Sequence, residues 1–144
     1  LGQWALPNCN LFIMDSFGEM GSLFSLADLT ILGGSIVPKG GHNPLEPAAF
    51  GLPIITGPHT FKNTTEFAGL RKCGVVFDLA NDGVDPVITG QAIADMAVTI
   101  VKDKAQYRRI KSAAQAYAAT ASKRSNNAAK MIAAIVRASQ SIRE

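Results

Sequence analysis

The chain has 144 residues, of which 47% are apolar and 17% charged, and its formal net charge is +3. This composition is typical of one globular domain with a substantial core and excludes a disordered or fibrous chain. No apolar run approaches the roughly 18 residues of a membrane-spanning helix, and Leu1 is followed by no basic and apolar leader, so we expect a soluble piece of a longer chain.

The first half of the chain alternates short apolar runs with helical segments. The apolar runs that predict strands occupy residues 10–15, 29–32, 53–56 and 75–77. Segments with helical spacing predict short helices within residues 16–27, from Pro44 or Leu45 to about residue 50, and over 63–72. The middle one of these is bounded by Asn43, a favoured N-cap, and by Gly51, where a helix C-terminus favours glycine.

After Asp85 and Pro86 the pattern becomes almost entirely helical. We expect helices near 88–102, 104–120 and 122–142, with a break near 120–125. Strands that alternate with helices indicate βαβ units, which build a parallel sheet covered by helices on both faces. The sequence therefore predicts an α/β, Rossmann-like core over about 1–103 and a helical tail over about 104–144.

Charge is distributed unevenly along the chain. Residues 1–100 carry nine acidic and four basic side chains, a balance of −5, whereas residues 101–144 carry two acidic and ten basic ones, a balance of +8. A basic tail indicates either a solvated helix face or attraction to an anionic partner such as a membrane surface. No aromatic residue follows Tyr117, so a stacking platform for nucleic acid is not expected.

The two cysteines, Cys9 and Cys73, have neither CxxC spacing nor a nearby histidine. Such cysteines are expected to be buried, reduced thiols in a cytosolic setting. His42 and His59 likewise have no third ligand at a suitable spacing. We therefore expect no metal site.

Three glycine-containing segments should meet at the carboxyl edge of the sheet, where parallel α/β proteins bind ligands. They are Asp15–Met20, Gly33–Ser35 and Gly40–Pro47. In the last segment, glycines lead into a helix start whose amides suit an anion, and a first-turn carboxylate, Glu46, could accept hydrogen bonds from ribose hydroxyls. The pattern favours a nucleotide site, although a glycine turn capped by Asn43 would also produce it.

The site lacks the usual nucleotide fingerprints. Neither GxxxxGK[ST] nor a GxGxxG after a strand is present, which argues against an ATPase or an NAD enzyme. The segments GEM at 18–20, GGS at 33–35 and GGHNPLEPAAFGLPIITGPH at 40–59 instead resemble the C-terminal half of 3-deoxy-D-manno-octulosonic acid (Kdo) transferases, which are GT-B glycosyltransferases. The resemblance covers residues 10 to about 80 and weakens in the helical tail.

The resemblance implies an activity for the parent protein. The family transfers Kdo from CMP-Kdo to a lipid A precursor in lipopolysaccharide synthesis, at the cytoplasmic face of the inner membrane of Gram-negative bacteria. The acceptor site, the membrane anchor and the catalytic base belong to an N-terminal domain that is absent from this sequence. The fragment is therefore expected to bind CMP-Kdo without a cofactor or metal, to hold no catalytic residue and to be inactive alone.

The same resemblance implies the CMP-binding residues, which are Phe17, Gly18, Glu19, Asn43, Pro44, Leu45 and Glu46. Further candidates are Gly34, Ser35, Lys39, Gly41 and His42. The amides around Asn43 to Leu45 would hold the phosphate, and Glu46 would bind the ribose. This chain has DSFGEM where the family usually has DTMGEL, so the residue at this position is an aromatic, Phe17, on which the cytosine could stack. Another CMP contact is expected upstream of residue 1.

Two other functions fit the residues. One is a GT-B glycosyltransferase or epimerase that uses a UDP-sugar on the same scaffold, which would prefer UDP to CMP. The other is a non-catalytic binding module whose basic tail docks on a membrane or a partner. Such a module would bind no nucleotide and would bind anionic vesicles in a salt-sensitive way.

Overall fold

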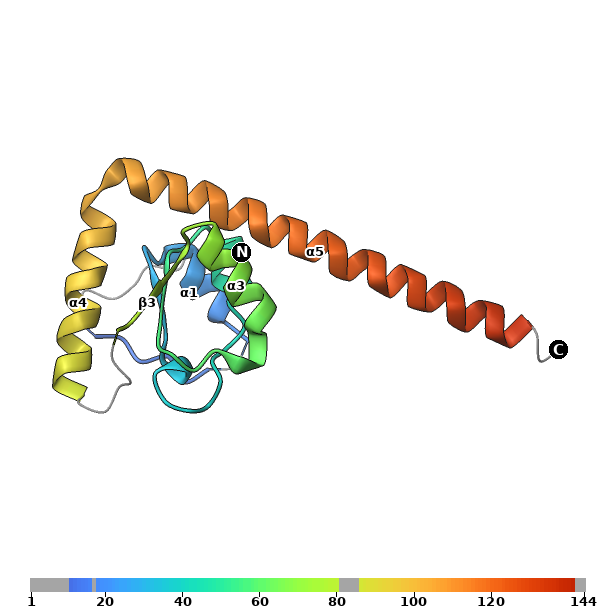
Figure 1. Ribbon diagram of the computed structural model, residues 1–144, viewed down its shortest axis with the longest axis horizontal. Helices are drawn as coiled ribbons and strands as arrows, with labels where there is room; N and C mark the ends of the chain where they lie inside the picture. The colour runs from blue at the N-terminus through green and yellow to red at the C-terminus, as the bar shows by residue number, and fades with distance from the viewer. Residues whose placement is uncertain (1–10, 17, 81–85, 142–144) are drawn as a thin grey trace.

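The computed structural model describes residues 11–16, 18–80 and 86–141, with side chains described in these ranges except at 86–88, 129 and 132–141. The order of elements is α1 (Met20–Leu26), β1 (Thr30–Leu32), the 3-10 helix η1 (Gly33–Ser35), α2 (Leu45–Ala49), β2 (Ile54–Thr56), the 3-10 helix η2 (Phe61–Asn63), α3 (Thr64–Lys72), β3 (Val76–Asp78), α4 (Pro86–Lys102) and α5 (Lys104–Ser141). Figure 1 shows the small sheet enclosed by helices, with α5 extending far beyond it.

The three strands form one parallel sheet in the order β1–β2–β3, with Thr30, Ile54 and Val76 in register. The central strand β2 is completely buried, because it has a strand on each side and helices on both faces. The α/β, Rossmann-like class predicted from the sequence is therefore confirmed. The expected strands at 29–32, 53–56 and 75–77 correspond to β1, β2 and β3.

The helices divide between the two faces of the sheet. Helix α4 covers one face, while α2 and α3 lie on the other, and α5 starts beside α4 and then runs over α2 and α3 (Figure 1). The core between these layers centres on Phe67 and Leu70 of α3, Ile54 and Ile55 of β2, and Ala114 of α5, all of which are fully buried. The first half of α5 is thus part of the packed unit.

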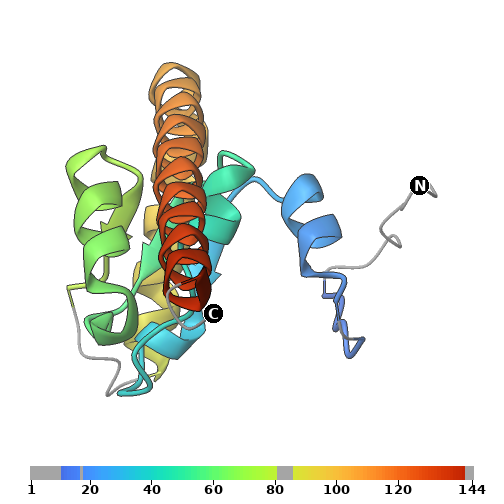
Figure 2. The ribbon, with the colours of Figure 1, turned by 90° about the vertical axis from the view of Figure 1, so that its right-hand side faces the viewer.

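The strand expected at residues 10–15 is not formed in the described part of that segment. Residues 11–15 belong to no element, and Leu11 and Ile13 are 77% and 78% exposed. Figure 2 shows this segment and α1 standing to one side of the sheet. An apolar run becomes a strand only when it pairs with a neighbouring strand, and residues 11–15 pair with none of the three strands of the sheet.

The helical tail is one helix rather than two. Residues 104–141 form a continuous α5, so the break expected near 120–125 is wrong. The segment SKRSNN at 122–127 contains residues of modest helix propensity but neither glycine nor proline, and the small propensity cost does not end a helix that is already formed. The expected end of one helix at residue 102 and start of the next at 104 are confirmed. Asp103 Oδ1 accepts hydrogen bonds from the amides of Ala105 and Gln106 at 3.0 and 2.9 Å, which caps the start of α5.

The outer half of α5 should be dispensable for folding. Ile110, Ala114 and Ala118 are buried against the core, whereas every side chain described from residue 122 to 131 is exposed. We expect a chain truncated after Asn127 to unfold within about 2 °C of the full chain, while its far-UV circular dichroism loses helical signal. A truncation after Arg109 is the contrasting variant and should not fold. A Tm drop of 10 °C or more in the shorter truncation would mean that the outer half is packed after all.

Two further expectations concern single features. Cys73 is a free thiol, but it is exposed rather than buried, because it caps the end of α3 at the surface; Cys9 lies outside the described residues. Within the described ranges, none of the helices is both long enough and apolar enough to span a bilayer.

Candidate nucleotide site

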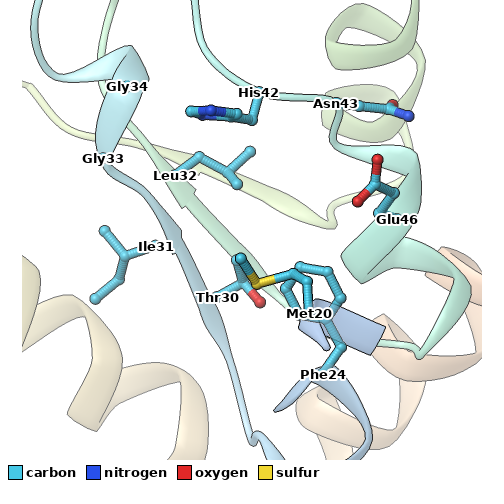
Figure 3. A pocket seen from close by; sticks show the side chains of 10 residues that line it. All are labelled: Met20, Phe24, Thr30, Ile31, Leu32, Gly33, Gly34, His42, Asn43 and Glu46. Carbon is cyan, nitrogen blue, oxygen red and sulfur yellow. The ribbon is translucent and has the colours of Figure 1, made fainter. Parts of the chain in front are cut away.

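A cavity of about 380 Å³ lies where β1 ends, between α1 and the start of α2. It sits at the carboxyl edge of the parallel sheet, as expected for an α/β protein. Figure 3 shows the side chains around it. Its lining residues are Met20, Phe24, Thr30, Ile31, Leu32, Gly33, Gly34, His42, Asn43 and Glu46.

One wall of this cavity is apolar. It is formed by Met20 and Phe24 of α1, whereas the Ile31 side chain points to the other side of β1 (Figure 3). The ring of Phe24 lies 5.9 Å from that of Phe50 at the end of α2, and this contact holds α1 next to α2. Ile31 is 44% exposed because β1 is an edge strand. The wall therefore suits the flat face of a ligand such as a nucleobase.

The opposite wall is polar and comes from the loop that leads into α2. The Asn43 amide oxygen accepts a hydrogen bond from the Leu45 backbone N–H at 3.1 Å, which fixes the turn before the helix. Pro44 and Pro47 are buried and anchor α2. Glu46, in the first turn of this helix, is exposed, and its carboxylate points into the cavity (Figure 3). A carboxylate in this position can accept two hydrogen bonds from neighbouring hydroxyl groups.

Ser35 holds the glycine turn rather than lining the cavity. Its hydroxyl is completely buried and donates to the Leu32 carbonyl at 2.5 Å. It accepts hydrogen bonds from the Thr56 hydroxyl and from the Gly57 backbone N–H, both at 2.8 Å. Because a serine hydroxyl offers one donor and two acceptor sites, all of them are in use. The Ser35 hydroxyl is therefore not free to bind a ligand.

The other predicted residues are placed around the cavity. Gly18 has a φ of +87°, and Glu19 accepts a hydrogen bond from the Ser16 hydroxyl; both precede α1 without lining the cavity. Gly41 is buried, and its N–H donates to the Gly34 carbonyl at 3.1 Å, which ties the loop to η1. Lys39 is exposed and does not line the cavity. Phe17 lies outside the described residues.

A second cavity of about 380 Å³ lies on the other side of Asn43 and Glu46, between α2 and the middle of α5. Its lining residues are Asn43, Leu45, Glu46, Ala49, Ala118, Ala121, Ser122, Ser125 and Asn126. Glu46 therefore lines both cavities. The α5 side of the second cavity, like the apolar wall of the first, carries no recognisable sequence motif, which is why the sequence did not reveal either.

No cluster of three or more His, Cys, Asp or Glu side chains with suitable spacing occurs among the described residues. What the first cavity offers is a flat apolar wall, a carboxylate and neighbouring polar groups. This arrangement can bind and orient a small polar molecule with an apolar ring, such as a nucleotide.

Comparisons with known proteins found related sequences and a related structure. No protein-family profile matches the chain. A segment of 58 residues is 52% identical to the 3-deoxy-D-manno-octulosonic acid transferase of Haemophilus influenzae. This match covers 39% of this chain and 14% of that protein. The enzyme of the same name from Aquifex aeolicus is 37% identical over 73 residues, which covers 51% of this chain and 21% of the relative. The matched segments thus span about a fifth or less of these curated relatives.

The fold also has a solved counterpart. The crystal structure of the C-terminal CMP-Kdo binding domain of WaaA from Acinetobacter baumannii matches with a TM-score of 0.55 and 25% sequence identity. The match covers 72% of this chain and 50% of that one. In sequence and in fold, this chain therefore resembles the C-terminal domain of 3-deoxy-D-manno-octulosonic acid transferases.

Proposed function

We propose that this chain is the donor-binding domain of a glycosyltransferase, and that it binds CMP-Kdo and the CMP that remains after transfer. The observation that carries the proposal is the position of Glu46. It belongs to the segment that most resembles the transferases, and its carboxylate points into the cavity at the carboxyl edge of the sheet. The matching solved domain is named for CMP-Kdo binding, which supports the choice of nucleotide.

In this proposal, the base and the ribose of the nucleotide contact different walls of the cavity. Cytosine lies on the apolar wall near Met20 and Phe24, and the ribose hydroxyls donate to Glu46. Asn43, Pro44 and Leu45 shape the turn that holds Glu46 in place. The proposal keeps residues 17–19, which directly precede Met20 in the sequence, as further contacts of the nucleotide.

The proposal also covers the longer protein to which this donor domain belongs. Residues 1–144 form one donor domain, and an N-terminal domain supplies the acceptor site, the catalytic base and the membrane anchor. The longer protein transfers Kdo to a lipid A precursor at the cytoplasmic face of the inner membrane of a Gram-negative bacterium. The exposed basic side chains on the outer half of α5, such as Lys123 and Lys130, face either that domain or the anionic membrane surface.

The test is a calorimetric titration of the chain with CMP. Replacing Glu46 with Ala should weaken CMP binding by about tenfold or more, because a charged acceptor for two hydroxyls is lost. The fold should be unaffected, because Glu46 is exposed. Binding of 2′,3′-dideoxy-CMP should be weak in the wild type and nearly unchanged by the substitution, since that ligand lacks the hydroxyls in question.

The matched control is Glu66→Ala. Glu66 also lies in the first turn of a helix, α3, but lines neither cavity, so its loss should leave CMP affinity unchanged. UMP, UDP and AMP complete the series. Tighter binding of UDP than of CMP would favour an enzyme that uses a UDP-sugar, and equal CMP affinity in wild type and Glu46→Ala would refute the ribose role.

A further inference from the structure

The first cavity contains one side chain that can carry positive charge. Of its ten lining residues, only Glu46 and His42 are ionisable, and only His42 can be cationic. The phosphate of a nucleoside monophosphate is an anion that proteins bind with cationic groups and N–H donors. Among the described lining residues, His42 is therefore the one side chain that can give a phosphate a hydrogen bond from a cationic group.

The exposed His42 ring packs against Gly34 without using its nitrogens. A Cβ on Gly34 would lie 3.0 Å from His42 Nδ1 and 3.2 Å from Cε1, so the ring rests directly against the glycine. Figure 3 shows the imidazole extending across the cavity above Leu32, toward Gly34. No hydrogen bond to either ring nitrogen occurs among the described residues. The ring nitrogens can therefore still donate to a ligand.

The start of α2 is a weaker phosphate site than its sequence suggested. Pro44 has no N–H, and the Leu45 N–H already donates to the Asn43 side chain. Helix α2 has only five residues, so its dipole is small, and Glu46 places a negative charge in its first turn. Because like charges repel, a phosphate is favoured at the end of the cavity away from Glu46.

We propose that His42 binds the phosphate of the nucleotide and thereby fixes which way round it lies. This inference rests on the proposed function. The phosphate lies at the Gly34–His42 end, the ribose lies at Glu46, and the base lies on the wall of Met20 and Phe24. In the donor, the same phosphate links the nucleoside to the sugar, so His42 marks the end of the cavity where the sugar leaves the site.

The experiment compares CMP with cytidine, which differ only in the phosphate. Both ligands are titrated into wild type, His42→Gln and His42→Lys in the same buffer. We expect His42→Gln to reduce the preference for CMP over cytidine by about tenfold, because a charged hydrogen bond is lost. His42→Lys should retain most of the preference, and cytidine should bind all three proteins similarly, which shows that the cavity is intact.

The matched control is His59→Gln. His59 is partly buried and lines neither described cavity, so removing its imidazole should leave the preference for CMP unchanged. If wild type binds both ligands and His42→Gln keeps the full preference for CMP, the role of His42 is refuted while the nucleotide site stands. If wild type binds neither ligand, the proposed function fails and this inference fails with it.

Discussion

Replacing Gly57 with Ala should destabilise the fold by at least about 3 kcal/mol. A Cβ at this position would lie 2.4 Å from the Ser35 carbonyl oxygen and 2.5 Å from the Ile36 Cα. Both are backbone atoms, so no side chain can rotate away, and the turns after β1 and β2 would have to separate. We expect Tm to fall by about 10 °C or more, as measured by calorimetry or circular dichroism.

The control is Gly90→Ala in α4. A Cβ there meets no atom within 4 Å, and alanine is favoured over glycine inside a helix by up to about 1 kcal/mol. This variant should be as stable as wild type or slightly more so. A Gly57→Ala protein that melts within 2 °C of wild type would contradict the close approach of the two turns.

The second large effect is expected for Ser35→Ala. The substitution removes the acceptor of the buried Gly57 N–H and of the Thr56 hydroxyl, and the donor to the Leu32 carbonyl. Buried polar groups left without partners cost about 1–3 kcal/mol each. We expect a total loss of about 2–4 kcal/mol in urea-induced unfolding, together with weaker CMP binding because Gly33 and Gly34 lose their support.

Two variants separate this network from a simple loss of a hydroxyl. Ser25→Ala removes an exposed hydroxyl that donates to the Ser22 carbonyl at 2.7 Å and should change stability by less than about 0.5 kcal/mol. In the double variant Ser35→Ala/Thr56→Val, one of the stranded groups is itself removed. Its loss should therefore be smaller than the sum of the single losses, and strict additivity would argue against the network.

Local signals in the sequence predict most of the fold because they act over a few residues. Asn43 and Gly51 bound α2, and Gly51 adopts a φ of +79° that favours glycine. Residues 10–15 show the limit of such signals, because a strand needs hydrogen-bonding neighbours that no local pattern reveals. The uninterrupted α5 shows the converse, since several residues of weak helix propensity do not end a helix without glycine, proline or a competing contact.

The candidate site was predictable only on its polar side. Glu46, His42 and Asn43 stand together in one unusual segment, and the structure places all three on the first cavity. The apolar wall of Met20 and Phe24 was not foreseen, because it depends on how α1 packs beside the end of α2, which no local pattern in the sequence reveals. Ser35 is the opposite case. Its place in a glycine segment made it a candidate for binding CMP, and nothing in that segment indicates that its hydroxyl is buried and fully hydrogen-bonded.

The projecting helix α5 also determines how the molecule tumbles in solution. At 1.5 Å per residue, the 38 residues of α5 extend for about 57 Å, and the outer half stands clear of the sheet and its helices (Figure 1). Rotational diffusion of such an elongated body is anisotropic. The N–H bonds of α5 lie along the long axis, so they reorient more slowly than those of the strands, and nuclear spin relaxation of the helix and of the sheet would report two apparent correlation times from one rigid molecule.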